Sequence, residues 1–189
     1  MTDDRQPHQR RSIRLPEYDY SQEGAYFVTI ITQDRKCLFG EVIEREMVLN
    51  DVGKMVEQVW KDIPKRFPSV NVDTYMVMPN HIHGIIVIEQ TYIKEMYEHG
   101  LSSGVRATHA SPLQTTRPKG PKPKSIGAIV GSFKSAATNR INKTFNTLGE
   151  PVWQRNYYER IVRNEREHQA VYDYILTNPQ NWAEDTEYM

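Results

Sequence analysis

The sequence predicts an α+β fold in which helices pack on a small antiparallel sheet. Short segments rich in β-branched and aromatic residues alternate with longer segments whose apolar residues recur at helical spacing. The predicted order is strand, helix, two strands, long loop, helix, short extended piece and helix, which is typical of helices layered on one sheet. A chain of 189 residues is long enough for one compact core and short for two.

The first predicted elements are a strand, a weak hairpin and an amphipathic helix. Residues 25–32 read AYFVTIIT, a composition and length typical of a strand. The charged segment EVIEREMVLN at 41–50 predicts a short hairpin or edge strand. Asn50 predicts a helix cap, because apolar residues then recur at helical spacing until Pro64 and Pro68: Val52, Met55, Val56, Val59, Trp60 and Ile63.

Two adjacent strands follow. Residues 70–78 and 83–89 are apolar runs joined by Pro79-Asn80, so we expect a tight connection, with the second strand beginning around His81 and His83. Residues 92–99 predict a short helical segment.

A flexible basic loop is predicted at about 100–125, where Gly, Ser, Thr, Pro and Lys dominate and too little apolar surface is available for folding. A helix should then carry apolar residues at 126, 129, 130, 133, 137 and 141. The last helix is predicted from about Asn164 to Asn178 and should be stopped by Pro179.

The remaining bulk features concern the ends of the chain and its compartment. Residues 1–22 are polar and proline-bearing, which predicts a flexible N-terminal arm ahead of a single domain at 23–189. The single Cys37 has no partner for an internal disulfide, and no apolar run is long enough to cross a bilayer. No signal peptide is recognisable, so we expect a cytoplasmic protein without a membrane partner.

The net charge of zero hides a polarised distribution. Residues 100–149 contain no Asp or Glu but eight basic residues: Arg106, Arg117, Lys119, Lys122, Lys124, Lys134, Arg140 and Lys143. This stretch can follow a phosphate backbone and so give salt-sensitive affinity for nucleic acid. A solvated linker whose charges only maintain solubility would have the same composition.

The pattern His81-Ile82-His83 is a candidate metal motif. In a strand, residues two apart share a face, so both imidazoles can reach one ion while Ile82 faces the core. Hydrogen-bonded surface histidines produce the same pattern, and a metal site needs a third ligand.

The last helix offers Tyr174 and Asn178, which are four residues apart and therefore share a helix face. If this face covers the histidines, Asn178 can complete a metal site beside the Tyr174 hydroxyl. Alternatively, Tyr174 packs in the core with Val171 and Ile175, and Asn178 only ends the helix before Pro179.

Four segments in this order resemble the REP-associated tyrosine transposases, within the insertion-sequence family of single-tyrosine transposases that carry a His-hydrophobic-His (HUH) motif. They cover most of the chain after the arm: VMPNHIHGIIVI at 77–88, SIGAIVGSFKSAATNRIN at 125–142, VWQRNYYERIVRNEREH at 152–168 and VYDYILTNP at 171–179. The sequence departs from a minimal member at 102–124, where its loop is longer and more basic.

The resemblance implies a ferredoxin-like core, a divalent metal such as Mg or Mn, and a tyrosine that forms a covalent bond to DNA. His81 and His83 match the metal pair, Tyr174 matches the nucleophile, and Asn178 lies where the family places a further polar ligand. The implied activity is nicking and rejoining of single-stranded DNA through a 5′-phosphotyrosine. A hydrolase would need a positioned water, and no carboxylate lies beside the histidines for that task. The implied partner is single-stranded DNA with hairpin repeats, and family members act either as homodimers or as monomers.

Further residues are predicted to contact DNA. The basic ones are Arg117, Lys119, Lys122, Lys124, Lys134 and Arg140, and the aromatic ones that can stack on unpaired bases are Trp153, Tyr157 and Tyr158. Trp153 can equally pack the last strand onto the core. Tyr157 and Tyr158 are rival nucleophiles, although neither has a metal-ligand residue one helical turn away. Two other functions stay open, a non-catalytic nucleic-acid-binding regulator of the same fold and a metal phosphoesterase that uses water.

Overall fold

The computed structural model describes residues 18–89 and 121–184. The strands are β1 Gly24–Ile31, β2 Gly40–Ile43, β3 Glu46–Leu49, β4 Val70–Val77, β5 His81–Ile88 and β6 Tyr158–Val162. The helices are α1 Asp51–Lys61, α2 Ile63–Arg66, α4 Ile126–Phe145 and α5 Glu165–Thr177, with short 3-10 helices η1 Gln33–Arg35 and η2 Asn178–Glu184.

Four strands form one antiparallel sheet in the order β4-β5-β1-β6. With α1 between β1 and β4 and α4 between β5 and β6, this order is the ferredoxin-like β-α-β-β-α-β arrangement. The predicted α+β class and ferredoxin-like core are confirmed. The hairpin predicted from 41–50 is also present, as the separate two-stranded sheet β2-β3.

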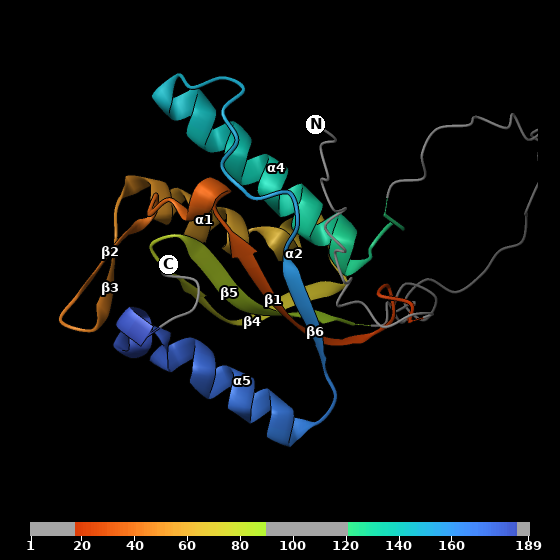
Figure 1. Cartoon of the computed structure of the whole chain (residues 1–189). Helices are drawn as coiled ribbons and strands as arrows, with labels where there is room; N and C mark the ends of the chain where they lie inside the picture. Colours follow the sequence, from red (N-terminus) through yellow and green to blue (C-terminus); the bar gives the residue numbers. More distant parts are fainter. Residues whose placement is uncertain (1–17, 90–120, 185–189) are drawn as a thin grey trace, which may run out of the picture.

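The two faces of the sheet are covered by different helices (Figure 1). Helices α1, α2 and α4 lie on one face, and α5 crosses the other. Alternation along β5 explains this division, because Ile82 and Ile86 belong to the main core while Ile85 packs with α5. His81 and His83 are in phase with Ile85, so both histidines point toward the α5 face.

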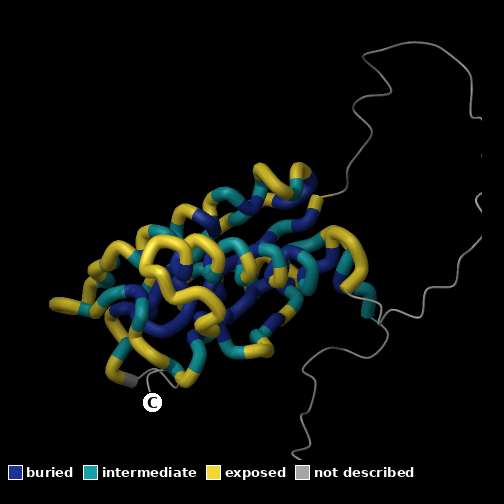
Figure 2. The backbone as a smooth tube through the Cα atoms, turned by 90° about the horizontal axis from the view of Figure 1, so that it is seen from above, coloured by how far each residue is buried: buried dark blue, intermediate teal, exposed yellow. Residues whose placement is uncertain are grey.

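The main core lies between the sheet and helices α1 and α4, and Figure 2 shows buried residues concentrated inside the molecule. Trp60 of α1 lies directly against β5 at Gly84, where an added Cβ would come within 2.3 Å of the indole Cζ2. Glycine is therefore required for this close approach of helix and strand. Trp60 therefore packs against β5 on the face of the sheet opposite the histidines.

Asparagine side chains cap two of the helices, and the cap at Asn50 was predicted from the sequence. Asn50 caps α1 by accepting a hydrogen bond from the Gly53 backbone N–H at 2.9 Å. Asn164 caps α5 in the same way, accepting from the Glu167 N–H at 2.9 Å. These bonds satisfy amide groups that have no partner within the helix. The predicted apolar stripe of α4 is confirmed, since all six of its residues at 126–141 are buried.

The structure differs from the sequence prediction at the start of the domain and agrees with it at the end of the last helix. The sequence predicts a loose arm to residue 22, but Tyr20 is buried in the main core and its carbonyl accepts a hydrogen bond from the Ile126 N–H. At the other end, α5 ends at Thr177 with Asn178 as its C-cap, so the predicted end of the helix before Pro179 is confirmed, and the chain continues in the 3-10 helix η2. A proline near the start of a helical turn is tolerated, since its missing N–H is not needed there. The predicted helix at 92–99 and most of the basic loop lie outside the described residues.

Candidate active site

The two histidines form the buried floor of the site. His81 and His83 lie opposite Ile31 and Thr29 of β1 and are 0% and 2% exposed. Their ring centroids are 4.3 Å apart at an angle of 63°. The alternative of surface histidines is therefore wrong, and the prediction that Ile82 faces the core is confirmed.

Each histidine is held through its Nδ1 atom. The His81 Nδ1 lies 2.8 Å from the Asn80 Oδ1, and the His83 Nδ1 lies 2.8 Å from the Thr29 hydroxyl oxygen. Burial, with a smaller effect of His81, holds the pKa of His83 well below its usual value. His83 is thus neutral at physiological pH, which is the state in which an imidazole binds a metal ion.

Tyr174 approaches the histidines from α5. Its hydroxyl lies 3.2 Å from the His83 Nε2, and the two ring centroids are 5.1 Å apart. The ring also makes an edge contact with Phe27. Tyr174 is 45% exposed, whereas Val171 and Ile175 of the same helix are buried. The alternative in which Tyr174 packs in the core with those residues is therefore wrong.

Asn178 lies one turn beyond Tyr174, at the junction of α5 and η2, and is 3% exposed. Its side-chain oxygen is buried, as is the Nε2 of His81. Further along η2, the Trp182 ring lies 5.9 Å from the His81 ring. Along the chain, Asn178 thus lies between Tyr174, whose ring contacts His83, and Trp182, whose ring contacts His81.

This donor set suits a divalent cation of borderline or hard character. Imidazoles suit borderline transition-metal ions, and an amide oxygen suits harder ions such as Mn²⁺, whereas imidazole is less typical of Mg²⁺. Within the described part of the chain, no group of three or more His, Cys, Asp or Glu side chains is placed to hold a metal. Among the described residues, the Asn178 amide is a candidate third ligand.

The rival tyrosines are less well placed. Tyr157 donates a hydrogen bond from its hydroxyl to the Glu159 carboxylate at 2.6 Å. Tyr158 lies opposite Thr29 on the edge strand β6, and its ring makes an edge contact with Phe27 at 6.1 Å. Tyr158 therefore shares the face of the sheet that carries the histidines, but Tyr174 is the tyrosine with a hydroxyl contact to His83.

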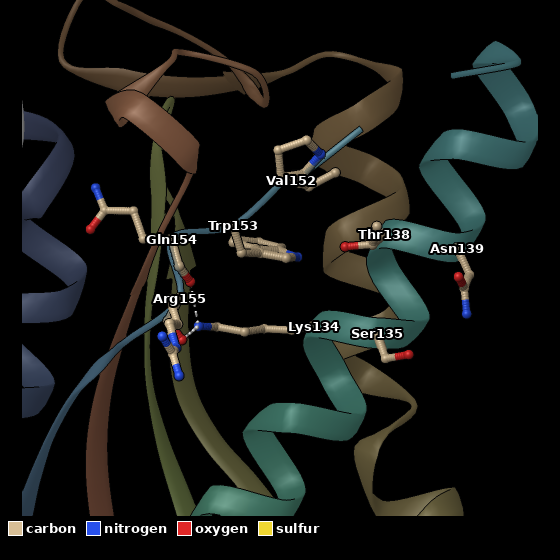
Figure 3. A pocket seen from close by; sticks show the side chains of 9 residues that line it. Lys134, Ser135, Thr138, Asn139, Val152, Trp153, Gln154 and Arg155 are labelled. Atoms are coloured by element: carbon tan, nitrogen blue, oxygen red, sulfur yellow. Dashed lines mark hydrogen bonds between the residues drawn. The ribbon is translucent and has the colours of Figure 1, made fainter. Parts of the chain in front are cut away.

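Lys134 holds the segment that leads into β6. Its ammonium donates to the backbone oxygens of Gln154, Arg155 and Asn156 at 2.9, 3.4 and 3.0 Å. Burial lowers the pKa of Lys134 to about 8. Figure 3 shows it beside an open pocket of about 300 Å³ between α4 and this segment. The ammonium of Lys134 is therefore engaged with backbone carbonyls in this structure. Its contact with DNA stays a prediction.

The other predicted DNA-binding residues are dispersed. Arg140 is exposed on α4, and Lys124 is exposed ahead of that helix. Lys122 pairs with Asp19 at 3.0 Å. Trp153 is 7% exposed and packs against Phe39 and Phe133, so the structure places its indole in the core. Arg117 and Lys119 lie outside the described residues.

Sequence reasoning missed four residues of the site: Phe27, Thr29, Asn80 and Trp182. Thr29 is a polar residue within an apolar strand, and Asn80 directly precedes the histidine pair, so both carried a weak local signal. The Phe27 ring stacks on His83 at 5.5 Å, a contact that depends on the pairing of β1 with β5.

Within residues 18–89 and 121–184, every helix is too short or too polar to cross a lipid bilayer.

Comparisons with known proteins bear on the family and the fold of the chain. No family model matches the chain. An uncharacterised protein of Haemophilus influenzae is 43% identical over 183 residues, which cover 96% of this chain and 94% of that protein. A second protein of that organism, named "Putative REP-associated tyrosine transposase", is 23% identical over 85% of this chain and 73% of its own length.

A solved structure of a REP-associated tyrosine transposase bound to a REP hairpin has the same fold. It superposes with a TM-score of 0.56 at 15% identity and covers 90% of this chain and 74% of that chain. The resemblance seen in the four sequence segments is confirmed. The chain therefore belongs to the same family as the uncharacterised Haemophilus influenzae protein, and it is similar to REP-associated tyrosine transposases in sequence and fold.

Proposed function

We propose that the chain is a DNA transposase that nicks and rejoins single-stranded DNA, with Tyr174 as nucleophile. The observation that carries this proposal is the contact of the Tyr174 hydroxyl with the His83 Nε2 at 3.2 Å, next to the buried His81. A half-exposed tyrosine beside a pair of buried histidines combines a reachable nucleophile with an ordered ligand set.

The chemistry assigned to Tyr174 conserves the energy of the broken bond. The phenol gives up its proton, its oxygen forms a bond to phosphorus, the bond from phosphorus to the 3′ oxygen breaks, and that oxygen leaves with a proton. The DNA 5′ end is then held as a phosphotyrosine. A 3′ hydroxyl can attack this ester and release the phenol, so rejoining needs no ATP.

His81, His83 and Asn178 are the residues proposed to hold a divalent metal. When bound, such an ion neutralises charge on the phosphate and orients it for in-line displacement. The chain contributes rigidity, because both imidazoles are buried and each is hydrogen-bonded at its Nδ1. Phe27 stacks on His83 and contacts Tyr174, which limits the positions that both rings can take.

The proposed substrate is single-stranded DNA that carries hairpin repeats. Support comes from the related structure, which is of a transposase bound to a REP hairpin, and from the acid-free stretch at 100–149. Exposed basic residues such as Arg140 and Lys143 on α4 would contact phosphates and give salt-sensitive affinity.

The test is incubation of the purified chain with 5′- and 3′-labelled single strands from the repeats that flank its gene, with Mn²⁺ or Mg²⁺. We expect a covalent protein adduct on the 5′ phosphate side and a free 3′ hydroxyl on the other fragment. Cleavage without an adduct would indicate a phosphoesterase that uses water. Binding without cleavage would indicate a regulator of the same fold, and either result would refute the proposal.

A further inference from the structure

Asn80 occupies a fixed position at the entrance to β5. It is 0% exposed, and its backbone oxygen accepts a hydrogen bond from the Thr32 N–H at 2.8 Å. Its side-chain nitrogen donates to the backbone oxygen of Arg35 at 3.3 Å. Its side-chain oxygen lies 2.8 Å from the His81 Nδ1.

These contacts determine the orientation of the amide. The Arg35 carbonyl can only accept hydrogen bonds, so it must face the NH₂ group of Asn80. The Oδ1 atom then faces His81. An amide oxygen also only accepts, so the proton of this hydrogen bond must be on the Nδ1 of His81. In a neutral imidazole that proton is the only one, and the lone pair is left on Nε2.

His83 is not constrained in this way. Its Nδ1 faces the Thr29 hydroxyl and its Nε2 faces the Tyr174 hydroxyl, and a hydroxyl can donate or accept. Both tautomers of His83 therefore satisfy their two neighbours. The two histidines differ, because only His81 has a partner at Nδ1 that cannot donate.

We propose that Asn80 is a positioning residue that fixes His81 in its Nδ1–H tautomer and so presents the Nε2 lone pair to a divalent cation. This inference rests on the proposed function. The His81 Nε2 is buried on the α5 side of the sheet, next to the rings of His83 and Trp182. A hydrogen-bond acceptor behind a ligating imidazole sets both its tautomer and its ring orientation.

A purely structural role for Asn80 would predict a different result. In that case the residue only fixes the turn through its contact with Arg35, and the tautomer of His81 would not depend on the Asn80 oxygen. Asn80→Asp separates these roles, because Asp retains an acceptor for His81 but cannot donate to the Arg35 carbonyl. Asn80→Ala removes both groups.

The experiment measures long-range ¹H–¹⁵N correlations of the metal-free chain labelled with ¹⁵N-histidine at pH 8, and in parallel the Mn²⁺ affinity by electron paramagnetic resonance. Wild-type chain and Asn80→Asp should show His81 protonated at Nδ1. Asn80→Ala should shift His81 toward the Nε2–H form and weaken Mn²⁺ binding by about ten- to a hundred-fold. Asn71→Ala, at an exposed position on β4, is the matched control and should change neither value.

Three outcomes would overturn the inference. They are an Nε2–H tautomer of His81 in the wild-type chain, an unchanged tautomer in Asn80→Ala, or unchanged Mn²⁺ affinity despite a changed tautomer. The wild-type spectrum decides the first point even if Asn80→Ala fails to fold. A wild-type chain with the expected tautomer but no Mn²⁺ binding would instead refute the metal site of the proposed function, while supporting control of His81 by Asn80.

Discussion

Replacing Tyr174 with Phe removes one hydroxyl and retains the ring. The edge contacts with Phe27 and His83, at centroid distances of 6.0 and 5.1 Å, should survive. The hydrogen bond that disappears is 3.2 Å long, and the tyrosine side chain is 45% exposed. A net intramolecular hydrogen bond contributes about 0.5–1.5 kcal/mol, and partial exposure favours the lower half of that range. We therefore expect the free energy of unfolding to fall by less than about 1 kcal/mol, which corresponds to less than about 4 °C in Tm.

Catalysis should respond very differently from stability. Without the phenol oxygen no ester to phosphorus can form, so covalent adduct and cleavage should both disappear while DNA binding persists. The assay combines thermal unfolding, strand cleavage and peptide mapping of the adduct. Tyr172→Phe is the matched control on the same helix, and Tyr157→Phe and Tyr158→Phe test the rival nucleophiles.

Two results would refute the assignment of Tyr174. The first is full cleavage activity in Tyr174→Phe. The second is an adduct that maps to Tyr157 or Tyr158 in the wild-type chain. A fall in Tm much larger than about 4 °C would show that the hydroxyl is mainly structural, and the absence of activity would then not identify a nucleophile.

Four further predictions concern the metal ligands, the core, the ammonium on α4 and the basic loop. His81→Ala and His83→Ala should each abolish metal-dependent cleavage while circular dichroism shows a retained fold, and unchanged cleavage in both would exclude the metal assignment. Gly84→Ala should lower the free energy of unfolding by about 1–3 kcal/mol in urea titrations, because the new methyl group would overlap the Trp60 indole. Burial lowers the pKa of Lys134 from 10.5 to about 8, so between pH 8 and pH 10 the unfolded chain binds more protons at this residue than the folded chain. The free energy of unfolding of the wild-type chain, measured relative to that of Lys134→Met, should therefore rise from pH 8 to pH 10. The last prediction concerns neutral substitutions at four residues of the basic loop: Arg117, Lys119, Lys122 and Lys124. They should make single-strand binding less sensitive to salt, lowering the slope of log affinity against log salt by about 0.7 for each phosphate that is no longer neutralised. An unchanged slope would show that the loop is only a linker.

Local patterns in the sequence were sufficient for most of the fold. The Asn50 cap, the strand at 25–32 and the apolar stripe of α4 each depend on neighbours within a few residues, and all are present. Pro179 correctly marked the end of α5, but nothing in the sequence predicted the 3-10 continuation that places Trp182 against His81.

The site itself required information that a single sequence does not carry. The spacing of His81 and His83 identified a shared face, but their burial depends on α5 covering that face. The contact of Thr29 with His83 depends on the register of β1 against β5, which pairs residues 54 positions apart. A shift of that register by one residue would turn Thr29 to the other face.

Helix α5 packs on the sheet through a small apolar cluster that is separate from the main core. Val171 and Ile175 are the only residues of α5 itself that are buried. A hydrogen bond between His168 and Asp73, in β4, adds one polar contact at 2.6 Å. Helices with so few buried side chains open at a lower free-energy cost than the central strands of a sheet. If α5 opened in this way, a DNA end bound to Tyr174 would move relative to His81 and His83, which lie on β5.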